Sequence, residues 1–176
     1  DALSGRLREL AATHRTTLFT VLLTAYQTLL SKYTSSTDIA VGTVVSGRAR
    51  PELQQLIGYG INSLVMRAEW DGDPRFSALL ERGRSVVLDA FDHQETPFAR
   101  LVDELQPERD LSRTPLFQAA FTLHESRTAA YDLPGVRVEP SPCPPRWPVR
   151  PPVADRGVPD GSLQASSSTP PRCSTG

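Results

Sequence analysis

The chain of 176 residues is long enough to bury a substantial core, and its 19 basic and 20 acidic residues nearly balance. Because no basic stripe stands out, the composition argues against a nonspecific nucleic-acid surface. No apolar stretch is long enough to span a membrane and the first residues lack the form of a signal peptide, so we expect a cytoplasmic protein. Cys143 and Cys173 have neither a disulfide framework nor metal-ligand spacing.

Apolar residues at helical spacing predict two helices between Leu3 and about Tyr33. The second begins after Thr16 or Thr17, and the Thr17 hydroxyl is a candidate N-cap. Since this helix is apolar on nearly all sides, we expect it to be buried. The next predicted elements are a buried strand, a short helix and a second strand, over residues 38–45, 51–57 and 61–70.

In the following part of the chain, the spacing of apolar residues also alternates between that of a helix and that of a strand. After a turn at 71–74, we expect a long amphipathic helix from Phe76 to Phe91 and a shorter helix that opens after Pro97 and contains Phe98 to Leu105. A strand over 116–123 and a candidate strand over 136–139 follow. Helices and strands in alternation predict an α/β (α+β) fold with one mixed sheet flanked by helices.

Composition changes near Pro140, which divides the chain into a folded part, residues 1–139, and a Pro/Ser-rich tail, residues 140–176. From Pro134 onward, 11 of 43 residues are proline and no apolar period survives. One interpretation is a disordered linker, which cannot bury enough surface to order itself. The other is a shifted reading frame in GC-rich coding, and resequencing the coding region would decide between the two.

Asn62 and Arg67 are the polar residues of the second predicted strand. Asn62 follows Gly58 at the start of the strand, where asparagine commonly favours a turn. Arg67 shares a strand face with Ser63 by period-two counting. An arginine there is commonly an exposed or ion-paired surface residue.

Other candidates for chemistry are weak. His93 ends a helix, where its ring suits exposed carbonyl groups, and we do not expect it to act as a base. Phe98, at the start of the next helix, is expected in the core. Ser112 has no histidine or aspartate in a nucleophile pattern, so a serine hydrolase is rejected. The sequence also has no P-loop, dinucleotide fingerprint or zinc spacing.

Three segments, 57–67, 93–102 and 109–118, resemble motifs of the condensation domains of non-ribosomal peptide synthetases, in the same order and rough spacing. They begin Ile-Gly-Tyr-Gly-Ile-Asn-Ser, His-Gln-Glu-Thr-Pro-Phe and Arg-Asp-Leu-Ser-Arg-Thr-Pro-Leu. The resemblance runs from about Leu3 to Val138. The family's active-site motif, His-His-x-x-x-Asp-Gly, lies in the other half of that domain, and this chain has no His-His pair. The chain therefore resembles the C-terminal half of a condensation domain.

This resemblance implies a chloramphenicol-acetyltransferase-like lobe, paired with an N-terminal lobe of the same domain. The apolar helix over 18–30 is a candidate contributor to the surface that meets that lobe. The resemblance also implies donor and acceptor peptidyl carrier proteins, whose phosphopantetheine arms deliver thioesters to a tunnel between the lobes, and an adjacent adenylation domain. The acceptor amine would attack the donor thioester and form an amide. No cofactor, metal or catalytic residue is expected on this half.

The resemblance also assigns roles to residues. Implied substrate-channel residues are Gly58, Asn62, Ser63, Arg67 and Arg113. Implied structural motif residues are His93, Gln94, Pro97, Phe98, Arg109, Asp110, Ser112, Pro115, Phe117 and Gln118. The chain departs from the family at Gly60, where a bulky aromatic residue is usual.

Alternative functions stay open on the sequence. One is a stand-alone acyltransferase of the same superfamily, and another is a non-catalytic remnant that docks a carrier protein. Epimerisation and heterocyclisation domains share similar motifs, and the residues upstream of Asp1 would discriminate among all of these.

Overall fold

The computed structural model describes residues 2–48, 51–107, 113–123 and 153–154. Its elements in chain order are α1 (Ala2–Thr13), α2 (Leu18–Thr34), β1 (Asp38–Ser46), the 3-10 helix η1 (Pro51–Leu53), β2 (Ile61–Glu69), α3 (Phe76–Asp92), α4 (Phe98–Leu105), β3 (Ala119–Phe121) and β4 (Val153–Ala154).

The strands form one mixed sheet in the order β2-β1-β3-β4. β1 and β2 pair antiparallel over their whole length, from Asp38 opposite Glu69 to Ser46 opposite Ile61. β3 runs parallel to β1, and β4 runs parallel to β3. This arrangement confirms the predicted fold class, one mixed sheet flanked by helices.

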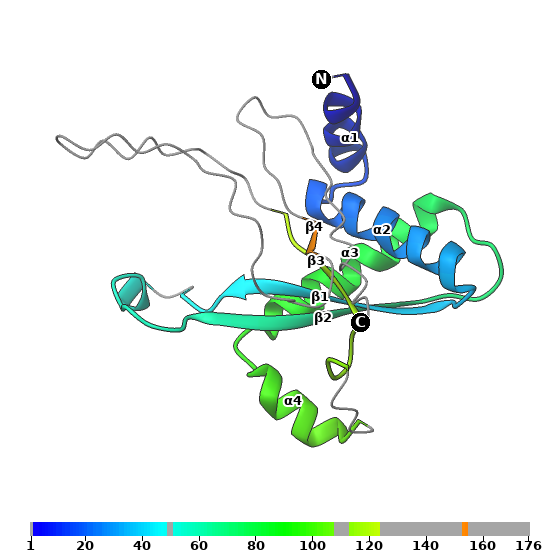
Figure 1. The fold of residues 1–176 in the computed structure, drawn as a ribbon. Coiled ribbons are helices and arrows are strands. Elements are labelled where there is room, and N and C mark those ends of the chain that lie inside the picture. The colour runs from blue at the N-terminus through cyan, green and yellow to red at the C-terminus, as the bar shows by residue number, and fades with distance from the viewer. Residues whose placement is uncertain (1, 49–50, 108–112, 124–152, 155–176) are drawn as a thin grey trace, which may run out of the picture.

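The main core lies between one face of the sheet and helices α2 and α3. Alternate strand residues point into it, including Val41 of β1 and Met66 of β2, which are both fully buried. Leu23 of α2, Val87 of α3 and Phe121 of β3 belong to the same cluster. In Figure 1, α4 lies on the opposite side of the β1–β2 ribbon from α2. Among the described residues, no helix has the combined length and apolar character of a membrane span.

The start of α2 is as predicted. The Thr17 side chain accepts a hydrogen bond of 3.2 Å from the Thr20 amide, which satisfies one free donor of the first turn. The expected burial of α2 on nearly all sides is wrong, since Leu29 is 52% and Tyr33 is 81% exposed. The reason is that the sheet, α3 and α1 cover only part of the helix surface.

Two other elements are shorter than predicted. The helix expected over 51–57 is only the 3-10 turn η1, and the strand expected over 116–123 contains only β3. Leu116 has a φ of 68°, a left-handed conformation that cannot continue a strand. The candidate strand at 136–139 and the tail, apart from β4, lie outside the described residues.

Candidate functional site

Asn62, in the first of the three sequence motifs, is bonded directly to the second motif. Its Nδ2 donates to the backbone oxygens of Gln94 at 2.9 Å and Thr96 at 2.7 Å. Its Oδ1 accepts from the backbone amide of Phe98 at 3.1 Å. One side chain of β2 therefore holds the connection between α3 and α4.

The local sequence explains why the α3–α4 connection needs a hydrogen-bond partner from another element. His93 ends α3, and the chain turns back through a bond from the Thr96 amide to the His93 oxygen. Pro97 then precedes α4 and makes no side-chain cap. The first amides of a helix lack intrahelical partners, and Asn62 supplies one for Phe98. In Figure 1 the chain descends from α3 past β2, an edge strand of the described sheet, to reach α4.

The third motif joins the same assembly through Phe117. Its ring centroid lies 5.7 Å from that of Phe98. The ring also covers Gly42 of β1, where any Cβ would overlap it. Phe98 is only half-buried, so its expected place in the core is wrong. Since α4 packs mainly against β2 and against this ring, one side of Phe98 stays open.

A hollow of about 430 Å³ adjoins the Asn62 assembly. On one side it is lined by the β1–β2 hairpin, including Ser46, Tyr59 and Gly60. On the other side lie Asn62 and the α3–α4 loop, including Gln94 and Pro97. The motif loop thus forms one wall of a concave surface large enough for part of a small organic chain.

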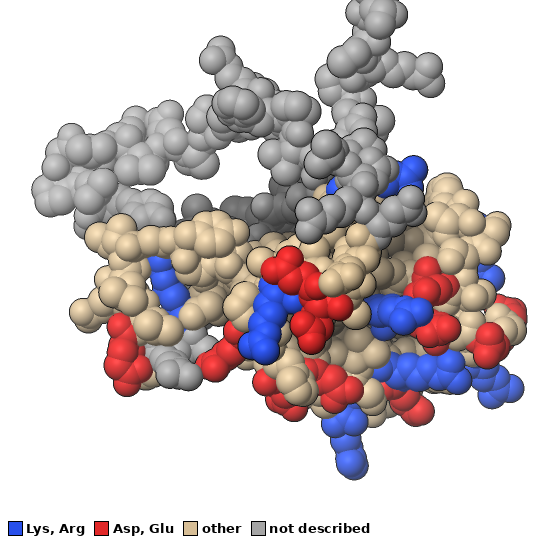
Figure 2. All heavy atoms as spheres, turned by 90° about the horizontal axis from the view of Figure 1, so that it is seen from below, with Lys and Arg blue, Asp and Glu red and all other residues tan. Residues whose placement is uncertain are grey.

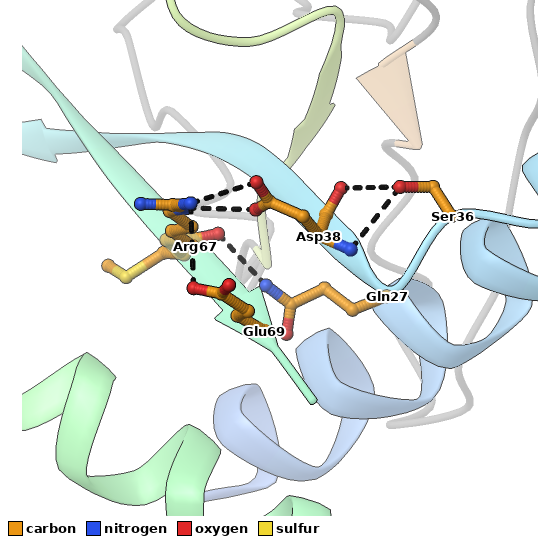
Figure 3. Close-up of polar contacts among 6 residues, drawn as sticks. Gln27, Ser36, Asp38, Arg67 and Glu69 are labelled. Atoms are coloured by element: carbon orange, nitrogen blue, oxygen red, sulfur yellow. Dashed lines mark hydrogen bonds and ion pairs between the residues drawn. The ribbon is translucent and has the colours of Figure 1, made fainter. Parts of the chain in front are cut away.

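Arg67 lies elsewhere, five residues further along β2 or about 17 Å by strand rise. As predicted from the strand alternation, the Arg67 side chain points to the other face of the sheet from that of Asn62. Its cross-strand partner on β1 is Ala40. Its guanidinium makes a two-bond fork with the Asp38 carboxylate, at 2.8 and 2.9 Å, and lies 3.5 Å from Glu69 (Figure 3). The fork holds the pKa of Asp38 below its ordinary value.

The other channel candidates do not gather around Asn62. Gly58 is exposed, and its oxygen accepts a 2.7 Å bond from the Arg48 guanidinium. Ser63 is half-buried on the same strand face as Arg67. Arg113 is exposed near the start of the described segment 113–123.

The remaining motif residues make local contacts. The His93 ring lies 2.9 Å from the Asp89 oxygen, at the helix end where it was expected. Gln118 donates to the Thr114 oxygen at 2.6 Å, and the Pro115 oxygen accepts from the Phe117 amide at 2.9 Å. Arg109, Asp110 and Ser112 lie outside the described residues. Within the part of the chain that the structure describes, no cluster of three acidic, histidine or cysteine side chains could hold a metal ion.

Sequence reasoning missed two members of the assembly, Thr96 and Gly42. Thr96 contributes only its backbone oxygen, for which the sequence carries no signal. Gly42 did carry one, because a glycine inside a β-branched strand commonly marks a close approach of another group.

The family of this chain follows from comparison with known proteins. The family model described as the condensation domain matches residues 1–137. The chain belongs to the condensation-domain family. It is also 42% identical over 137 residues to tyrocidine synthase 3 of Brevibacillus parabrevis, and 40% identical over 138 residues to bacitracin synthase 1 of Bacillus licheniformis. Each match covers 78% of this chain, but only 2% of the first synthase and 3% of the second, so the chain spans a small part of these relatives.

Superposition on solved structures supports the same family. A four-domain nonribosomal peptide synthetase bound to AMP and glycine superposes with a TM-score of 0.68 and 25% identity, over 72% of this chain and 10% of that one. The condensation domain of the monacolin K polyketide synthase MokA gives a TM-score of 0.62 and 27% identity, over 68% of this chain and 28% of that one. The mixed sheet with its flanking helices is therefore an architecture that condensation domains share.

Proposed function

We propose that this chain is the C-terminal half of a condensation domain that forms amide bonds in a nonribosomal peptide synthetase. The observation that carries the proposal is the meeting of the three motifs: Asn62 of the first bonds the loop of the second, and Phe117 of the third packs on Phe98. The first two motifs line one concave surface, and the third packs on the second through its phenylalanine ring. This chain superposes on only about a quarter of a solved condensation domain, which supports the proposal that it is one part of such a domain.

In the proposed reaction, two carrier proteins present their substrates as thioesters on phosphopantetheine arms. The acceptor amine attacks the donor carbonyl carbon, a C–N bond forms and the C–S bond breaks. The donor arm leaves as a thiol after taking up the proton that the amine loses. The histidine that handles this proton belongs to the half that carries His-His-x-x-x-Asp-Gly. This half would supply tunnel wall and hold the arms in place, which is the proximity part of the rate enhancement.

An exposed apolar cluster on the β1–β2 hairpin supports a missing lobe as partner. Leu56 is 58%, Tyr59 90% and Ile61 51% exposed, and Ile57 is fully exposed. Exposed apolar residues that lie together commonly mark an interaction site, so we propose the hairpin, in addition to α2, as a part of the surface that meets the other lobe. Figure 2 shows acidic and basic side chains interspersed over the lower face, with no field of a single sign on it.

The roles of individual channel residues stay predictions. Asn62 lines the hollow, so we propose it for the tunnel wall, and Gly58 stays a candidate from the family resemblance alone. Ser63, Arg67 and Arg113 do not line the hollow. They would contact substrate only if the tunnel formed with the other lobe extends to their positions. The boundary at residue 139 stays a prediction from the change in composition, and a cytoplasmic location stays one from the form of the sequence. The adjacent adenylation domain is proposed from the family.

The test combines the chain with its missing half. The N-terminal lobe encoded upstream would be coexpressed with this chain, and the purified pair would be mixed with aminoacyl-loaded donor and acceptor carriers. Intact-protein mass spectrometry would follow the acceptor carrier, with the lobe's His-His pair changed to Ala-Ala as the control. We expect a dipeptidyl carrier only with the unmodified lobe.

Each other outcome identifies an alternative. Acyl transfer to a free alcohol or amine, with no carrier required, would favour a stand-alone acyltransferase. Carrier binding without product, or an upstream sequence that encodes no such lobe, would favour a docking remnant.

A further inference from the structure

We propose that Asn62 is a positioning residue, whose side-chain amide fixes the α3–α4 loop and thereby one wall of the 430 Å³ hollow. This inference rests on the proposed function, because it assigns the hollow to the substrate tunnel. The family resemblance implies that the Asn62 amide bonds either a backbone group or the thioester substrate, and the hydrogen bonds to Gln94, Thr96 and Phe98 favour the first of these roles.

The hydrogen-bonding capacity of the side chain is nearly exhausted. An asparagine amide has two N–H donors and one oxygen with two lone pairs. Nδ2 bonds the oxygens of Gln94 and Thr96, and Oδ1 accepts from the Phe98 amide. No N–H group is left to donate to a thioester oxygen. A direct contact with the substrate carbonyl would therefore break a bond that holds the loop.

The three bonds act together on one short segment. They fasten the backbone at residues 94, 96 and 98, on both sides of Pro97. The loop has local turns of its own, but these bonds tie it to β2, which is paired with β1 along its whole length. Asn62 thus transfers the rigidity of the sheet to the loop and to the first turn of α4.

The same loop forms part of the hollow. Gln94 and Pro97 line it together with Asn62 itself. Without the Asn62 amide the loop would lose these three bonds to β2, and this wall would shift. A wall displaced by about 1 Å can lower a rate on the order of 10²-fold, because orientation of the bound reactants is lost.

The test compares Asn62→Ala with Gln27→Ala in the intact synthetase that carries this chain. Gln27 is a matched control, since its buried amide also donates to a backbone oxygen of β2, that of Met66 at 2.9 Å, but far from the loop. Asn62→Asp is a second variant, because it keeps the acceptor for Phe98 and replaces the donors by oxygen. Backbone hydrogen exchange and steady-state kinetics with loaded carriers would be measured for all three.

For both Asn62 variants we expect faster exchange confined to the segment 94–101, by about tenfold for the Phe98 amide in Asn62→Ala. We expect kcat to fall on the order of 10²-fold while KM for the carriers changes less than about threefold. Gln27→Ala should lower overall stability without either effect. That contrast separates positioning from general destabilisation.

Unchanged exchange at 94–101 in Asn62→Ala would overturn the inference, and so would faster exchange there with an unchanged kcat. A large loss of kcat with normal exchange would restore the direct substrate contact. If the wild-type protein forms no amide bond, the proposed function fails and the tunnel role fails with it. The exchange data would then still decide whether Asn62 holds the loop.

Discussion

The ring of Phe117 lies in the space that a side chain at Gly42 would occupy. A Cβ built on Gly42 would lie 2.6 Å from ring atom Cδ2, and closer still to two further ring atoms. β1 is otherwise rich in β-branched residues, and a glycine inside such a strand lowers its stability. The contact with the ring explains the glycine, because only a residue without a side chain lets the third motif rest on the sheet.

Replacing Gly42 should therefore destabilise the protein. We expect Gly42→Ala to lower the free energy of unfolding by about 1–3 kcal/mol, the usual range for overpacking, as measured by urea denaturation. Combining it with Phe117→Leu should cost less than the sum of the two single changes, since the smaller side chain relieves the overlap. Strict additivity would mean that the ring does not lie on Gly42.

The half-burial of Phe98 predicts a modest loss on truncation. Phe98→Ala should lower the free energy of unfolding by about 1–2 kcal/mol, because only part of the ring is removed from water. Phe121→Ala is the matched comparison, since Phe121 is 9% exposed in the main core, and it should cost roughly 3–5 kcal/mol. Equal losses for the two variants would place Phe98 in the core after all.

Arg67 should control the titration of Asp38. The two hydrogen bonds from Arg67 lower the pKa of Asp38 in the folded state. A carboxyl with a lowered folded pKa stabilises the fold above its unfolded pKa, and this contribution disappears as the pH falls through the folded pKa. Arg67→Ala should raise the pKa of Asp38 toward its ordinary value, as followed by carbon NMR of the carboxyl group.

Arg67→Lys is the control for this titration. It keeps the charge but loses the planar fork, so it should restore only part of the shift. The pair is about half exposed, and its effect should also weaken with added salt. An Asp38 pKa that is the same in all three proteins would contradict the fork.

Arg113 should support the architecture rather than the chemistry. We expect Arg113→Ala to lower the melting temperature or the soluble yield at least as much as it lowers turnover. Thermal unfolding and condensation rate would be measured on the same preparations. An unchanged melting temperature with a collapsed rate would instead make Arg113 a direct substrate contact.

The chain alone should form no amide bond. Its histidines, His14, His93 and His124, include no adjacent pair, and the other wall of the proposed tunnel would be missing. Without both walls neither arm is oriented, so no proximity effect arises. Purified chain with loaded carriers should give no dipeptidyl carrier above background, and a clear product would show that the active site lies on this half.

The helices and the two long strands were predictable because their signals are local. Thr17 caps α2, Pro97 precedes α4, and the apolar alternation of β1 and β2 fixes which residues face the core. Such signals depend on neighbours within one or two turns, so a single sequence contains them. The three motifs also allowed the family to be predicted, since their order and spacing are properties of the sequence itself.

Only the tertiary structure decided what the motif residues contact. The Asn62 amide finds partners 32 to 36 residues away, and Phe117 meets Gly42 across the sheet. The half-burial of Phe98 depends on how few elements cover α4, and the fork of Arg67 depends on its register with Asp38. Propensity and periodicity are short-range quantities, whereas these contacts arise from the packing of distant segments, which no local pattern encodes.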